Sequence, residues 1–127
     1  MTKEIDGERR FLGHVAMNVR EKFLEILGSE SRGTFLVSLG NHLGISMRDI
    51  LREGGSGDLR QARACNEIMI AIWSQVGATI GGSAAGYPDS EFLSILIEKA
   101  DMGNARHHLR NAIEGALLVV ESAEGAQ

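Results

Sequence analysis

The chain has 127 residues, of which 43% are hydrophobic and 24% charged, and its formal net charge is −4. These values are ordinary for a globular protein, so they argue against an intrinsically disordered chain and against a membrane-spanning one. The length suits one domain over residues 1–127, with frayed ends at about 1–6 and 122–127. Cys65 is the only cysteine, and residues 1–14 lack the apolar run of a signal peptide, so we expect a cytoplasmic protein without a membrane partner.

Charge is unevenly distributed along the sequence. Residues 32–63 carry five arginines against three acids, whereas seven acids face three bases from Asp89 onward. Because opposite charges attract, an anionic partner is expected at the middle of the chain and not at its C-terminal part.

Spacings of three and four between apolar residues predict helices along the chain. A first helix is predicted from near Asp6 to Gly28, because aspartate favours helix starts and glycine favours the left-handed position after a helix. The apolar stripe of this helix consists of Phe11, Leu12, Val15, Val19, Phe23 and Ile26.

The next segment is predicted to contain two helices. The first of them runs from about 31 to 43 and is ended by Gly44. Ser46 followed by Asp49 is typical of a capping box, so a short helix is predicted over 46–53, before a glycine-rich loop.

A fourth helix is predicted from Asp58 to about Val76. The run at 68–72 is rich in β-branched residues and could be a strand, but the chain has no second strand to pair with it, so we favour a helix. The apolar stripe consists of Ala62, Cys65, Met69, Ile72, Trp73, Val76 and Ile80.

Two further helices are predicted in the C-terminal part. Pro88 and Asp89 open the fifth, and Gly103 and Asn104 separate it from a sixth. The stripe of the sixth consists of Leu109, Ala112, Ile113, Ala116, Leu117 and Val120. The sequence therefore predicts an all-α, single-domain bundle of five to six helices.

Residues 35–53 contain a patterned segment that begins FLVSLGNHLGIS. Apolar residues recur at Leu39, Leu43, Ile45 and Ile50, with Gly40 and Gly44 between them. In this pattern the segment resembles the helix-turn-helix of DNA-binding proteins, with Gly44 at the turn. The resemblance implies that Ser46, Met47, Arg48 and Arg52 contact phosphates and base edges. Glu53 stands where the motif has an apolar residue, and two packed helices joined by a capped turn explain the same pattern, so we favour the second interpretation.

Polar residues on and near the fourth helix are the candidates for a binding or catalytic pocket: Arg60, Arg63, Asn66, Glu67 and His108. Guanidinium groups bind planar anions, and Glu67 would orient Arg63. The alternative, which we favour, is a solvated face with a surface ion pair between Arg63 and Glu67. Asn66 lies at the margin of the apolar stripe, so it needs hydrogen-bond partners in a neighbouring loop or in a dimer interface.

No catalytic, metal-binding or cofactor-binding residue is assigned. His107 and His108 are adjacent and point about 100° apart on a helix, while His14 and His42 are isolated, which disfavours a shared metal ion. Cys65 lies on the apolar stripe and is expected in the core. We therefore expect no cofactor and favour a protein that is not an enzyme.

These observations favour a small interaction or regulatory protein that self-associates as a homodimer and could bind another protein. The candidate interface consists of Ile68 and Ile70, which flank the stripe of the fourth helix, and Trp73 at its edge. One alternative is a DNA-binding protein that uses residues 35–53, although nucleic acid is the less favoured partner. The other is a ligand-binding or enzymatic pocket around the fourth helix.

Overall fold

The structure, a computed structural model, describes residues 17–53, 58–81 and 87–125. All regular structure in these residues is helical, which confirms the predicted all-α bundle. The five helices in the described part of the chain are α2 (Met17–Leu27), α3 (Arg32–Glu53), α4 (Asp58–Ile80), α5 (Asp89–Met102) and α6 (Arg106–Gly125). None of them is long and apolar enough to cross a membrane.

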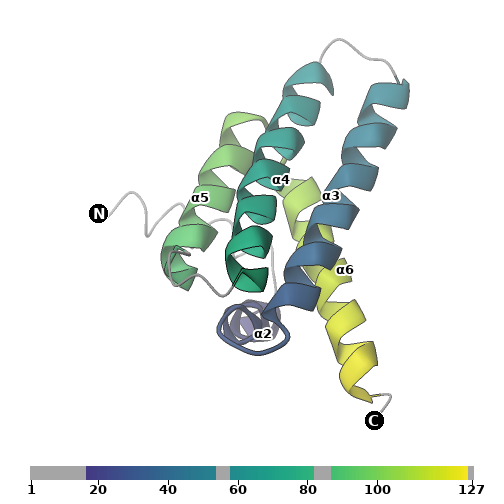
Figure 1. Cartoon of the computed structure of the whole chain (residues 1–127). Helices are drawn as coiled ribbons and strands as arrows, with labels where there is room; N and C mark the ends of the chain where they lie inside the picture. Colours follow the sequence, from purple (N-terminus) through teal and green to yellow (C-terminus); the bar gives the residue numbers. More distant parts are fainter. Residues whose placement is uncertain (1–16, 54–57, 82–86, 126–127) are drawn as a thin grey trace.

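The two longest helices, α3 and α4, form an antiparallel pair at the centre of the bundle (Figure 1). The contact between them is the most extensive in the molecule, followed by the contact of α3 with α6. α5 lies along the other side of α4, α6 passes behind α3, and α2 crosses near the lower ends of these helices (Figure 1). Among the described residues, α2, α5 and α6 therefore leave one side of the α3 and α4 pair uncovered.

α3 is one continuous helix, so the predicted turn at Gly44 and the predicted new helix start at Ser46 are wrong. Glycine inside a helix costs up to about 1 kcal/mol relative to alanine, which is why the sequence favoured a break. Packing explains why the helix continues. A Cβ added at Gly44 would lie 3.5 Å from the sulfur of Met69, so α4 fills the space beside this glycine.

The core joins all five described helices in one cluster of buried side chains. Phe23 of α2 and Phe35 of α3 meet there with ring centroids 5.3 Å apart in a tilted arrangement. Cys65 is fully buried, as predicted, and burial raises the pKa of its thiol to about 11. Ile68 is also fully buried, so its assignment to a dimer interface is wrong.

The ends of the helices agree with most of the predicted boundaries. α2 ends directly before Gly28, while the predicted start near Asp6 and the stripe residues 11–15 lie outside the described residues. α4 starts at Asp58 as predicted but continues four residues beyond Val76.

The joint between α5 and α6 depends on Gly103. A Cβ at this position would collide with the Cβ of Ala64 and lie 3.0 Å from the carbonyl oxygen of Arg60. Asn104 follows with a φ of 58°, which asparagine tolerates better than most residues. The two residues that were predicted to separate these helices therefore do so.

Candidate functional site

The outer face of α4 carries large apolar side chains that the described helices leave exposed. The exposed fraction is 58% for Ile70, 42% for Trp73 and 75% for Ile80, and Leu59 continues the row toward the start of the helix. Single exposed apolar residues are normal on a protein surface, but a row of them on one helix face is a candidate interaction surface. We call the residues 59, 63, 66, 70, 73, 77 and 80 the outer stripe of α4.

Trp73 is held in place by a close approach between α3 and α4. A Cβ at Gly40 would lie 2.9 Å from Cζ2 of the indole, so the ring rests against the backbone of α3. This contact fixes the indole and leaves another part of it at the surface. Gly40 therefore has a packing role that its position in a helix did not reveal.

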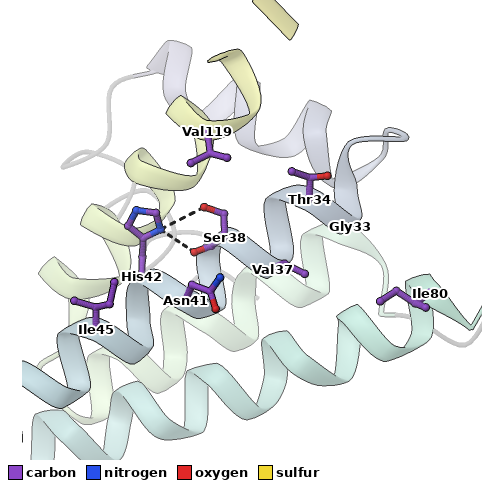
Figure 2. Close-up of a pocket in the computed structure, with 9 residues that line it drawn as sticks. All are labelled: Gly33, Thr34, Val37, Ser38, Asn41, His42, Ile45, Ile80 and Val119. Carbon is purple, nitrogen blue, oxygen red and sulfur yellow. Dashed lines mark hydrogen bonds between the residues drawn. The ribbon is translucent and has the colours of Figure 1, made fainter. Parts of the chain in front are cut away.

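A shallow groove of about 590 Å³ runs along α3 beside this stripe. Figure 2 shows that α3 supplies most of its lining, with Ile80 of α4 and Val119 of α6 at its margins. The remaining lining residues are Gly33, Thr34, Val37, Ser38, Asn41, His42 and Ile45. Because Ile80 borders the groove, the apolar surface extends from the outer stripe of α4 onto α3.

His42 in this groove is a packing residue. Its Nδ1 lies 2.8 Å from the carbonyl oxygen of Ser38 and 3.3 Å from the Ser38 hydroxyl (Figure 2). A carbonyl can only accept, so Nδ1 carries the proton and donates it. A Cβ at Gly115 would lie 2.6 Å from Nε2, so the other ring nitrogen is wedged against α6. His42 thus links α3 to α6 through its ring.

The predicted polar residues lie on α4 and α6 and have different surroundings. Arg60, Arg63 and Asn66 are exposed on α4. The carboxylate of Glu67 lies 3.6 Å from Nζ of Lys99 on α5, where the sequence predicted a pair with Arg63. The groove on α3 and a smaller groove between α2 and α6 are lined by other residues.

His108 lies at the edge of the core, and His107 is exposed, as predicted. Nε2 of His108 lies 3.3 Å from Oε1 of Gln61, which joins α6 to α4. Burial lowers the pKa of His108, and the charge of the neighbouring His107 lowers it further. The contact with Gln61 connects two helices.

The residues assigned to DNA contact lie on the uninterrupted α3. Arg48 and Arg52 are exposed, whereas Ser46 and Met47 are partly buried and turn toward neighbouring helices. A helix-turn-helix needs a turn between its two helices so that the second can enter the major groove. Residues 32–53 have no such turn, so the resemblance to that motif does not extend to its geometry.

Of the three predicted interface residues, Ile70 and Trp73 are exposed and Ile68 is not. The predicted stripe was centred too close to α3. At 100° between successive residues, the centre of the observed buried side lies about 60° from the centre of the predicted stripe, toward Ile68 and away from Trp73 and Ile80. The cause is that α4 is covered by α5 as well as by α3.

A buried polar network was missed by the sequence analysis. Nη2 of Arg32 donates to Oε1 of Gln75 at 2.6 Å, and Nη1 lies 3.2 Å from a carboxylate oxygen of Asp89. Gln75 is almost fully buried, so it needs this donor. The network joins the ends of α3, α4 and α5. The sequence feature that could have predicted it is the glutamine at position 75, which lies among the apolar residues of α4.

The described residues contain no cluster of three histidine, cysteine or acidic side chains that could hold a metal ion. Comparison of the chain with protein families, curated proteins and solved structures finds no match.

Proposed function

We propose that this protein is a cytoplasmic helical interaction protein that self-associates as a homodimer through the outer stripe of α4. The observation that carries the proposal is the exposure of Ile70, Trp73 and Ile80 along one side of a central helix. The opposite side of the same helix is buried in the core, so α4 carries large apolar side chains on both sides. A helix of this kind is expected to be covered on both sides.

The composition of the stripe supports a protein partner. Tryptophan is enriched among the residues that contribute most to binding energy in protein interfaces, and Trp73 is held rigid by Gly40. A rigid aromatic side chain loses little conformational entropy when a partner covers it. Burial of apolar area contributes about 25 cal/mol per Å², which favours covering the three exposed side chains.

The test is the molar mass of the wild type measured by light scattering during size exclusion, across a tenfold range of micromolar concentrations. We expect the mass of two 13.7 kDa chains at the highest concentration. Ile70→Glu places a charge in the centre of the stripe and should give the mass of one chain with unchanged helical circular dichroism.

The matched control is Met102→Glu, because Met102 is 71% exposed but lies at the end of α5. This variant should remain dimeric. A wild type that keeps the mass of one chain across the whole range, or an Ile70→Glu variant that dimerises as well as the wild type, contradicts the proposal.

A further inference from the structure

We infer that the partner of the outer stripe is a second copy of α4 in antiparallel orientation, with Ile70 of each subunit packed on Trp73 of the other. This inference rests on the proposed self-association and adds its geometry. The two-fold axis then passes between Ala71 and Ile72. The two subunits contribute the same surface, as a closed two-fold dimer requires.

The spacing of the outer stripe is that of a coiled-coil seam. Its members, residues 59, 63, 66, 70, 73, 77 and 80, are separated alternately by four and three residues. Every member is exposed on α4. An alternation of four and three is the pattern by which side chains of one helix fit between those of a facing helix. The best fit for this stripe is therefore another helix with the same spacing.

A parallel pair of α4 helices would place identical residues in one layer. Arg63 would face Arg63, which is repulsive, and Trp73 would face Trp73 in a crowded layer beside an empty layer of two Gly77 residues. In the antiparallel pair the two Arg63 residues are about 26 Å apart at 1.5 Å per residue. This separation exceeds the screening distance of about 8 Å at physiological salt.

The antiparallel register also matches large residues with small ones. Asn66 faces Gly77 of the partner subunit, which carries no side chain, and a Cβ at Gly77 would meet nothing within 4 Å of its own subunit. The aliphatic part of Arg63 covers Ile80 of the partner subunit. The layers of Ile70 on Trp73 lie at the centre, where interfaces concentrate their binding energy.

Other antiparallel registers are less complementary. A shift of one heptad toward the start of α4 would pair Asn66 with Ile70 and Arg63 with Trp73, so no apolar pair would remain at the centre. The opposite shift would leave Arg63 and Asn66 without a facing residue on the partner helix. The register centred between residues 71 and 72 is thus the one that covers the apolar side chains.

The size of the face agrees with a dimer that dissociates on dilution. Residues 63–80 span about 26 Å, and α3 and α4 together are about 20 Å wide, so the face offers about 500 Å² per subunit when the partner also covers the adjoining surface of α3. The total of about 1,000 Å² lies near the lower limit for a specific protein interface. A groove on α3 next to Ile80 leaves room for the partner helix at the margin of this face.

Disulfide cross-linking tests the register. Asn66→Cys and Gly77→Cys are made singly and together, and each protein is oxidised with glutathione disulfide at a concentration where light scattering shows a dimer. In the inferred register, position 66 faces position 77 of the partner subunit, so the double variant should form a covalent dimer on a non-reducing gel. Each single variant places its two thiols about 16 Å apart along the helices, beyond the reach of about 7 Å for a disulfide.

Three controls make the result decisive. The wild type reports any reaction of Cys65, which should be negligible because that thiol is buried. Met102→Cys reports random collisions of exposed thiols. Circular dichroism checks that each variant is folded. The substitutions at Asn66 and Gly77 lie on the exposed side of α4 and leave the core unchanged.

The outcomes separate this inference from the proposed function. Covalent dimer in the double variant, at least tenfold more than in either single variant, supports the antiparallel register. Efficient cross-linking of either single variant shows that the two α4 helices are parallel. A double variant that is dimeric but does not cross-link shows that the subunits associate through another face. Either result overturns the inferred register and leaves the proposed self-association intact. A wild type with the mass of one chain overturns both proposals.

Discussion

The two sides of α4 both carry large apolar side chains but have different surroundings. Cys65, Ile68 and Ile72 on the inner side are fully buried against α3, α5 and α6, whereas Ile70 and Trp73 on the outer side are exposed. The comparison teaches that apolar residues on one helix can serve two purposes. Those on the inner side stabilise the folded chain, and those on the outer side form the surface through which we propose that the protein self-associates.

The largest effect expected from this comparison is on folding. Ile68→Ala should lower the free energy of unfolding by about 2–5 kcal/mol, because it removes a fully buried side chain and leaves a cavity. Ile70→Ala is the matched control two residues away and should change it by less than about 0.5 kcal/mol at concentrations where the chain is monomeric. Urea denaturation measures both. Equal losses for the two variants would show that the two sides of α4 are not distinct.

Substitutions of Gly103 and Gly77 by alanine compare the covered and the exposed side of α4. Gly103→Ala places a methyl group against Ala64 on a covered side of α4 and should cost about 1–3 kcal/mol of stability, because backbone must move. Gly77→Ala adds a methyl group in open space on the outer stripe and should raise stability by up to about 1 kcal/mol, since alanine favours helix. Thermal denaturation of the monomer at low concentration compares them. Destabilisation by Gly77→Ala would place this position in a closed contact.

The smallest effect concerns the contact of His108 with Gln61 at the covered side of α4. Burial lowers the pKa of His108 below its usual value of 6.5, with a further contribution from His107. The unfolded chain therefore binds a proton more readily than the folded chain, and stability falls as the pH falls from about 6.5 through the folded pKa. His108→Gln keeps a polar group without this titration, so its stability should depend less on pH in this window. Identical pH profiles for the variant and the wild type would contradict the assignment.

Most helices of this protein are predictable because their signals are local. The start of α4 at Asp58, the opening of α5 at Pro88 and the joint at Gly103 and Asn104 follow from residues within one helical turn of each boundary. The burial of Cys65 and the exposure of Ile70 also agree with the apolar pattern of a single helix. The partners of Glu67 and His108 were not predicted, because the contacts with Lys99 and Gln61 depend on how the helices pack together.

The sequence by itself determined that the chain is helical, where most helices end and which residue types each helix offers to a neighbour, since these depend on interactions within a few residues. The tertiary structure decided whether α3 breaks at Gly44, because α3 packs along α4 and α6 on both sides of this residue. It also decided which apolar side of α4 is buried, because α5 covers Ile68 and leaves Ile70 and Trp73 uncovered. Such choices depend on residues far apart in the chain, whose contacts exist only after the helices have packed.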